Sequence, residues 1–140
     1  MTFNEYLNVE FHEMNSKAIE MRMPIKKEHM NELGTVHGAI IMALADMATG
    51  ILAIDLKYTA PTQSSYTNFL RPIMETDYLY ARSELIKRGR RTITIDCKLW
   101  GDDGKLAAIN RSDFVVLDEN VKLNPSDFIK KLQEGNYKKY

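Results

Sequence analysis

The stretch that decides the fold runs Asn31-Glu-Leu-Gly-Thr-Val-His-Gly-Ala-Ile-Ile-Met-Ala-Leu-Ala-Asp46-Met-Ala-Thr-Gly50. Its first part, Asn31 to Gly38, is polar and carries two glycines, which predicts a loop. The part from Ala39 to Ile54 is almost wholly apolar and rich in Ala, Met and Leu, which predicts a buried helix. One carboxylate, Asp46, interrupts this apolar run. Because a carboxylate is rarely buried without a partner or a task, Asp46 is the first candidate for chemistry.

The spacing within this stretch predicts how its polar groups are used. A helix that begins near His37 or Gly38 presents free backbone N–H groups and its positive dipole end at Gly38, which suits a developing oxyanion. Asp46 follows eight residues later, about 12 Å along the axis and about 80° around it. Gly38 and Asp46 of one chain can therefore hardly act on the same carbonyl carbon. If both are catalytic, we expect a two-fold dimer with side-by-side helices and the site at the interface.

Composition excludes several classes of protein. The 140 residues predict a single domain, 1–140, with a sizeable core. Lys+Arg and Asp+Glu are equal at 19 each, so no basic field favours nucleic acid. The lone Cys97 rules out an intrachain disulfide framework and a cysteine-based metal cluster. The three histidines lack close ligand spacing, so we expect no metal.

The chain carries no pattern typical of export or membrane insertion. The N-terminus lacks a basic region followed by an apolar core. The longest apolar run is short for a membrane span and is broken by Asp46. A single cysteine fits a reducing compartment. We therefore expect a cytoplasmic protein.

The rest of the chain predicts one sheet around one helix. Alternation such as Ile93, Ile95 and Cys97 against Thr94 and Asp96 indicates half-buried strands. Strands are expected at 9–14, 17–25, 63–70, 76–87, 91–100 and 105–117, the last four as a meander, with a long helix at about 37–55 and short helices at 2–7 and about 124–134. A lone long helix must bury its whole circumference, and a curved antiparallel sheet wrapped around it does so. The expected fold class is α+β.

The motif residues resemble those of a known family. Asn31-x-x-Gly34-x-x-His37-Gly38 followed by Asp46 resembles the signature of hotdog-fold acyl-CoA thioesterases of the phenylacetate-degradation (PaaI-like) type. Thr67-Asn-Phe-Leu-Arg-Pro72 resembles the family's next strand and its closing turn, and the likeness runs from about Val9 to Leu117. Ala39 departs from the second glycine that the family usually has. The resemblance implies a hotdog fold and an acyl-CoA thioester hydrolase, with coenzyme A as part of the substrate and no other cofactor.

Roles for the motif residues follow from this resemblance and from their chemistry. Asp46 is expected to act as general base or as nucleophile; otherwise it is a buried carboxylate satisfied by backbone N–H groups or by Thr49. The Gly38 N–H is expected to hold the oxyanion. His37 either orients the loop or contacts the substrate carbonyl. The resemblance implies that Asn31 binds the catalytic water or the thioester, whereas alone it is typical of a turn.

The resemblance also implies a hydroxyl that assists the carboxylate, on the strand after the helix. Counting back from Arg71-Pro72 places it at Thr62, with Ser64 two residues on and on the same strand face. Both residues remain candidates.

Two basic segments are candidates to bind the phosphates of coenzyme A. Arg88-Gly89-Arg90-Arg91 lies at a predicted tight turn between strands, and Arg71 precedes Pro72. Arginine suits phosphate, but a solvated hairpin tip explains the run equally well. Candidates to line an apolar acyl pocket, or simply to fill the core, are Met42, Met47, Tyr66, Phe69 and Met74.

Three functions are compatible with this pattern. Acyl-CoA thioester hydrolysis leads. A non-catalytic acyl-CoA-binding module is the alternative, and the retained Asp46 argues against it. A hydratase of the same fold would need a paired Asp and His, whereas His37 and Asp46 lie about half a turn out of phase on one helix. A sheet around one helix leaves an edge that needs cover, so we expect a homodimer or a dimer of dimers.

Overall fold

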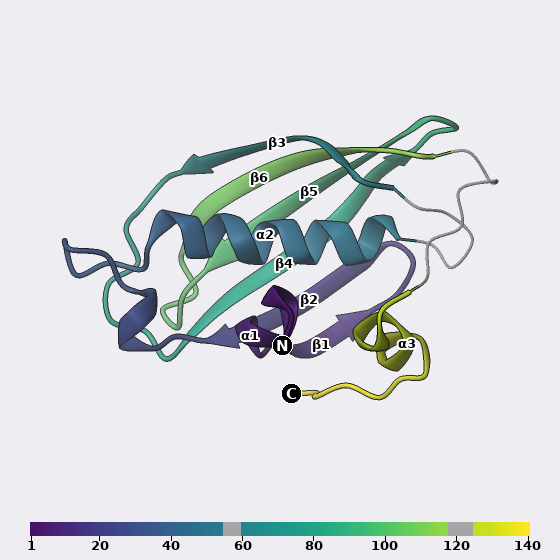
Figure 1. Cartoon of the computed structure of the whole chain (residues 1–140). Coiled ribbons are helices and arrows are strands. Elements are labelled where there is room, and N and C mark those ends of the chain that lie inside the picture. The colour runs from purple at the N-terminus through teal and green to yellow at the C-terminus, as the bar shows by residue number, and fades with distance from the viewer. Residues whose placement is uncertain (55–59, 118–124) are drawn as a thin grey trace.

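A six-stranded antiparallel sheet curves around one long helix in the computed structural model, which describes residues 1–54, 60–117 and 125–140 (Figure 1). The central helix is α2 (Gly38–Ala53), and the strands are β1 (Glu10–Met14), β2 (Ala18–Pro24), β3 (Thr62–Phe69), β4 (Tyr78–Arg88), β5 (Thr92–Trp100) and β6 (Leu106–Val115). Short helices are α1 (Phe3–Leu7), the 3-10 turn η1 (Lys27–His29) and α3 (Asp127–Gln133). Within these described ranges no helix is long and apolar enough to cross a bilayer.

The strand order is β1-β2-β4-β5-β6-β3, which corrects the expected meander. Strands β4, β5 and β6 do follow one another, but β3 pairs with β6 and not with β4. The connection 70–77, which contains Pro72, is too long for a tight hairpin. It is also fixed to the loop before α2, since the Val36 N–H donates to the Ile73 oxygen at 2.8 Å. The first strand after the helix therefore lies at the edge of the sheet.

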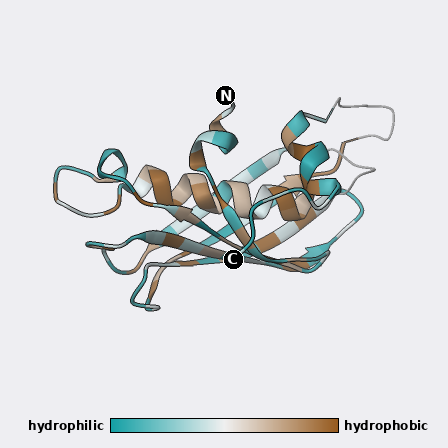
Figure 2. Ribbon diagram, turned by 90° about the horizontal axis from the view of Figure 1, so that it is seen from below, coloured by the Kyte–Doolittle hydropathy of each residue, from teal (hydrophilic) through white to brown (hydrophobic). Residues whose placement is uncertain are grey.

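The core lies between α2 and the concave face of the sheet. Ile93, Ile95, Cys97 and Leu99 are all buried, which confirms the alternation expected for this strand. Figure 2 shows apolar residues recurring along α2 and along the strands that it covers. The opposite side of α2 is different, because Ala39, Met42 and Asp46 are exposed. The expectation that the helix buries its whole circumference is therefore wrong for the single chain: one sheet covers one side of a helix.

The two edges of the sheet differ in how they are covered. On β1, the Phe11 N–H donates to the Lys138 oxygen at 2.8 Å, and the Tyr140 N–H donates to the Phe11 oxygen at 3.1 Å. The outer edge of β3 has no partner strand among the described residues. Its sequence, TQSSYTNF, contains neither proline nor charge, two of the features that keep an edge from pairing. The uncovered edge is thus the one next to the start and middle of α2.

The short helices follow their capping residues. Thr2 and Glu5 form the expected capping box of α1. The N-cap of α3 is Ser126, whose side chain accepts from the Ile129 N–H, so the helix begins at Asp127. The expected cap, Asn124, lies outside the described residues.

Candidate active site

Asp46 lies on the exposed face of α2, beside the first residue of β3. The Thr62 hydroxyl donates to Asp46 Oδ1 at 3.4 Å. The expectation of a buried carboxylate is wrong for the single chain, because the apolar run places Asp46 on the side of the helix that the sheet leaves open. Thr49 does not serve this carboxylate: its hydroxyl donates to the main-chain oxygens of Ala45 and Asp46. Asp46 is therefore an accessible acceptor with one hydroxyl donor.

A β-bulge decides which hydroxyl meets Asp46. Thr62 pairs with Phe114 but Ser64 pairs with Asp113, so Gln63 is an extra residue in β3. Phe114 is buried against the core, whereas the Ser64 hydroxyl donates to Asp113 Oδ2 at 3.2 Å on the outer face. The expectation that Thr62 and Ser64 share a strand face is therefore wrong. Of these two hydroxyls, only that of Thr62 is on the helix side of the strand.

The N-terminus of α2 leaves one backbone donor free. His37 is the N-cap, and its Nδ1 accepts from the Ala39 N–H at 3.0 Å. Its main-chain oxygen accepts from the N–H groups of Ile40 and Ile41. Because Nδ1 accepts, the neutral imidazole of His37 carries its proton on Nε2. No described residue accepts a hydrogen bond from either the Gly38 N–H or the His37 Nε2–H.

A cavity of about 360 Å³ opens at this end of α2, and it gathers several predicted residues. Asn31, Gly38 and Arg71 all line it, together with Phe69. The Phe69 ring lies close to the helix start: a Cβ built on Gly38 would be 3.4 Å from its Cζ. The predicted oxyanion donor and one predicted phosphate-binding arginine therefore share a cavity.

The Asn31 side chain organises the loop before α2. Its Oδ1 accepts from the N–H groups of Leu33 and Thr35, each at 3.0 Å. Its Nδ2 donates to the Thr35 hydroxyl at 2.8 Å. One N–H of the amide remains for a ligand, so the turn role and a contact with substrate are compatible.

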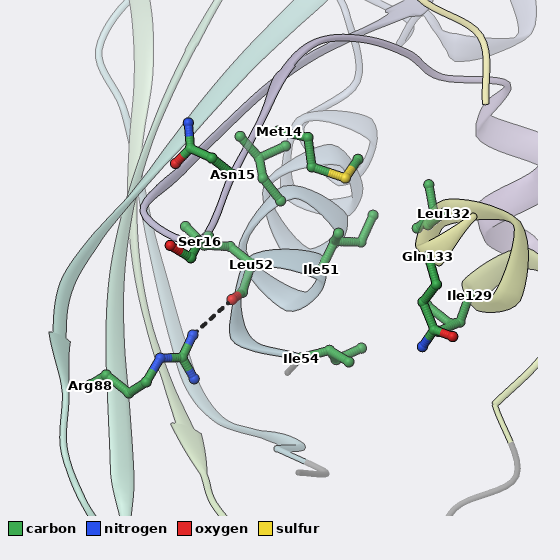
Figure 3. Close-up of a pocket in the computed structure, with 11 residues that line it drawn as sticks. Met14, Asn15, Ser16, Ile51, Leu52, Ile54, Arg88, Ile129, Leu132 and Gln133 are labelled. Carbon is green, nitrogen blue, oxygen red and sulfur yellow. Dashed lines mark hydrogen bonds between the residues drawn. The ribbon is translucent and has the colours of Figure 1, made fainter. Parts of the chain in front are cut away.

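Arg88 binds the C-terminal end of α2. Its guanidinium donates to the main-chain oxygens of Leu52 at 3.1 Å and of Ala53 at 3.4 Å. Figure 3 draws the bond to Leu52. Cations at helix C-termini stabilise the helix in this way. Gly89 is required by the turn, since a Cβ there would lie 2.9 Å from the Thr92 oxygen. The hairpin arginines and Arg71 thus lie at opposite ends of α2 in one chain (Figure 1).

A second cavity, of about 270 Å³, lies beside Arg88 and is lined mostly by apolar side chains, which come from β1, β2, α3 and the C-terminal end of α2 (Figure 3). It contains neither Asp46 nor Gly38. The chemistry expected from the sequence is therefore concentrated along the exposed face and the N-terminus of α2.

The candidates for an acyl pocket lie in different environments. Phe69 lies at Gly38, and Met42 is exposed on the same helix face as Asp46. Met47 is buried core, and Met74 is exposed in the connection 70–77. Tyr66 pairs with Arg111 on the outer face of the sheet, away from α2. Phe69 and Met42 remain the best candidates.

Cys97 and the metal-ligating side chains were the other candidates for chemistry among the residues that the structure describes. Cys97 is buried, and desolvation raises the pKa of its thiol, so it is a poor nucleophile. Among the described residues no three His, Cys, Asp or Glu side chains gather as metal ligands do. One residue that sequence reasoning passed over is His29, whose main-chain oxygen accepts from the His37 N–H at 2.8 Å. No spacing or periodicity in the sequence distinguishes it.

Comparison with known proteins identifies the family of the chain. Residues 33–108, more than half of the chain, match the model of the thioesterase superfamily. The chain belongs to this superfamily and is therefore a thioester hydrolase.

Solved structures show the same hotdog fold. A mutant thioesterase from Pseudomonas aeruginosa is 24% identical, with a TM-score of 0.76 over 83% of this chain and 86% of the other. A hypothetical thioesterase from Streptococcus pneumoniae, determined with coenzyme A, is 23% identical, with a TM-score of 0.73 over 79% and 86%. The Escherichia coli PaaI protein, from the phenylacetic acid degradation operon, is 21% identical, with a TM-score of 0.76 over 81% and 83%. The expected hotdog fold and PaaI-like resemblance are confirmed.

Proposed function

We propose that the protein hydrolyses acyl-CoA thioesters at a site shared between two copies of the chain. The observation that supports the proposal is the distance between the Asp46 carboxylate and the Gly38 N–H on α2. Asp46, with its Thr62 hydroxyl, lies eight residues from the free Gly38 N–H. That is about 12 Å along the helix, too far for both to act on one carbonyl carbon. With a second copy, each of two sites takes the Gly38 N–H from one chain and the Asp46 carboxylate from the other.

The exposed face of α2 fits this arrangement. If Gly38 of one copy meets Asp46 of a second, the two helices run antiparallel and the two-fold axis passes beside residue 42, halfway between them. Met42 is 46% exposed in the single chain, a large apolar side chain with nothing over it. The unpaired edge of β3 lies on the same side of the molecule. Apolar burial and strand pairing both favour a second copy here.

The chemistry follows from the groups present. Asp46 takes a proton from the attacking water, and the Thr62 hydroxyl holds the carboxylate through Oδ1. The Gly38 N–H, assisted by the His37 Nε2–H, stabilises the negative charge on the carbonyl oxygen. The tetrahedral intermediate then collapses to a carboxylic acid and expels the coenzyme A thiolate, which takes up the proton held by Asp46 and so restores the carboxylate. A nucleophilic Asp46 would instead form an anhydride. Label in Asp46 after a single turnover in ¹⁸O water would show that water opened this anhydride at the Asp46 carbon, which general-base catalysis never labels.

Coenzyme A is the proposed leaving group because of where the arginines lie. Arg71 lines the cavity at Gly38. In the antiparallel pairing, the C-terminal end of α2 in the second copy, with the hairpin arginines Arg90 and Arg91, approaches the same cavity. Arginines suit the phosphates of coenzyme A. The coenzyme A bound to the Streptococcus pneumoniae relative supports this choice.

The test begins with thiol release from a panel of aryl-CoA and short- to long-chain acyl-CoA substrates. Wild type should turn over some of them, and Asp46→Asn should lose about 10²-fold or more of kcat if Asp46 acts as the base. Tight binding without turnover would replace the hydrolase with a binding module. Full turnover by the variant would mean that another group is the base.

Mixing two inactive variants tests whether the site is shared. Asp46→Asn keeps Gly38, and Gly38→Pro keeps Asp46 but lacks the N–H. A mixed dimer of the two has one intact site and one that lacks both groups, so random exchange should restore about a quarter of wild-type activity. No recovery after verified exchange would show that each chain holds its own complete site.

A further inference from the structure

We propose that His29 is a positioning residue for the oxyanion end of α2, and that its neutral imidazole holds residues 26–37 in the shape that presents the Gly38 N–H. The effect of His29 on the rate of hydrolysis rests on the proposed function. Its effect on the conformation of residues 26–37 does not, and that effect can be measured without an activity assay.

His29 makes backbone contacts in both directions along the loop. It is 3% exposed. Its Nδ1 accepts from the Lys26 N–H at 2.8 Å, and its own N–H donates to the Lys26 oxygen at 2.9 Å. Its main-chain oxygen accepts from the N–H of His37, the N-cap of α2, at 2.8 Å. One buried residue therefore joins the start of this loop to the residue that precedes Gly38.

These contacts fix the tautomer of the ring. A backbone N–H can only donate, so Nδ1 carries no proton and Nε2 does. The Nε2–H meets the Tyr6 hydroxyl oxygen at 3.3 Å, and the two rings pack edge to face with centroids 5.8 Å apart. Tyr6 comes from α1, which is anchored by its capping box and by the buried Leu7. Helix α1 thus supports the start of α2 through His29.

A proton on Nδ1 would break this arrangement. The imidazolium would point an N–H at the Lys26 N–H, so the shortest side-chain contact of His29 would be lost. The groups that face the ring are Tyr6 from α1 and, from its own turn, Glu28 and Lys26. Burial lowers the pKa of His29, Lys26 lowers it further, and Glu28 opposes both. The folded state therefore favours the neutral ring that the geometry requires.

The sign of the pH effect follows from linkage. A histidine whose pKa is lower in the folded state binds fewer protons there than in the unfolded state. Its contribution to stability is present above the unfolded pKa and is lost as the pH falls through the folded pKa. His37 and Asp46 are other titratable groups at the proposed site. A variant that changes only His29 separates its contribution from theirs.

Two substitutions distinguish positioning from simple core packing. In His29→Asn, the side-chain oxygen replaces Nδ1 as acceptor for the Lys26 N–H but does not titrate. In His29→Ala, the acceptor is lost. We expect His29→Asn to keep kcat per folded molecule within about threefold at about pH 7.5 and to lose less activity than wild type by about pH 5.5. His29→Ala should lose about tenfold or more in kcat, with KM little changed, because the oxyanion donor is displaced.

The loop itself gives a readout that needs no activity. Hydrogen exchange of the His37 amide reports its bond to the His29 oxygen. At neutral pH, protection of this amide should be retained in His29→Asn and reduced in His29→Ala. At low pH, protection should fall in wild type and fall less in His29→Asn. Unchanged kcat and protection in His29→Ala, or an unchanged acid dependence in His29→Asn, would overturn the proposal. A wild type that hydrolyses no acyl-CoA would overturn the proposed function alone, and the exchange experiment would still decide the role of His29.

Discussion

The Thr62 hydroxyl lies 3.4 Å from Oδ1 of Asp46, although the two residues are sixteen positions apart in different elements. The β-bulge at Gln63 turns Thr62 toward the helix while Ser64 faces outward. One extra residue in an edge strand thus determines which of two similar hydroxyls meets the candidate base.

Thr62 and Ser64 form a matched pair for mutation. Thr62→Val keeps the shape but removes the hydroxyl from Asp46, and we expect kcat to fall about fivefold, the value of a hydrogen bond of about 1 kcal/mol. Ser64→Ala removes a bond to Asp113 on the outer face and should leave kcat unchanged. Steady-state kinetics with one acyl-CoA measures both. Equal losses in the two variants would contradict the assignment of Thr62.

Gly38 allows its N–H to be removed with little change to the helix. It is the first residue of α2, where proline is well tolerated, and the His37 backbone before it (φ −58°, ψ 133°) is close to the polyproline II conformation that a following proline allows. Gly38→Pro should therefore fold but lose about 10²- to 10³-fold in kcat, the typical effect of losing an oxyanion donor. Gly38→Ala keeps the N–H, and its Cβ only touches the Phe69 ring, so it should remain active. Circular dichroism checks that both variants fold. Equal activities of Gly38→Pro and Gly38→Ala would show that the Gly38 N–H has no part in the mechanism.

Met42 tests the proposed two-fold axis. Met42→Glu places two like charges beside each other in the dimer, so we expect a monomer by analytical ultracentrifugation and a parallel loss of activity. Met42→Cys should form a disulfide-linked dimer on mild oxidation, since residues at a two-fold axis meet their own copies.

Met74→Cys is the control for that crosslink. Met74 is also exposed but lies outside α2, in the connection 70–77, and should crosslink poorly. The native Cys97 is buried and should not interfere. Efficient crosslinking through residue 74 but not through residue 42 would place the interface elsewhere.

Arg71 and Arg88 should separate substrate binding from stability. Arg88→Met removes the guanidinium from the Leu52 and Ala53 oxygens, and we expect a loss of about 1 kcal/mol, or a Tm lower by about 2–6 °C, with KM unchanged. Arg71→Met should instead raise KM for the coenzyme A thioester several-fold at constant Tm, because Arg71 lines the cavity at Gly38. Thermal melts and steady-state kinetics of the two variants test this division. A raised KM in Arg88→Met would indicate that Arg88 also binds the phosphates of coenzyme A.

Part of this description followed from local sequence rules. The glycine-containing loop before an apolar run predicted α2, which the structure bounds at Gly38 and Ala53. Alternation predicted β5, and Thr2 with Glu5 predicted the cap of α1. These features depend on residues a few positions apart, so the chain specifies them wherever it folds.

The tertiary structure decided what depends on distant partners. The sequence by itself determined the helix, most of the strands and the residue types at its N-terminus, because periodicity and capping act over a few residues. It did not determine that β3 crosses to β6, that Gln63 forms a bulge, that Asp46 faces outward or that Arg88 caps α2. Each of those features depends on which surfaces pack together when the sheet covers one side of the helix. Local sequence does not specify this, because residues a few positions apart do not determine which distant element packs against them.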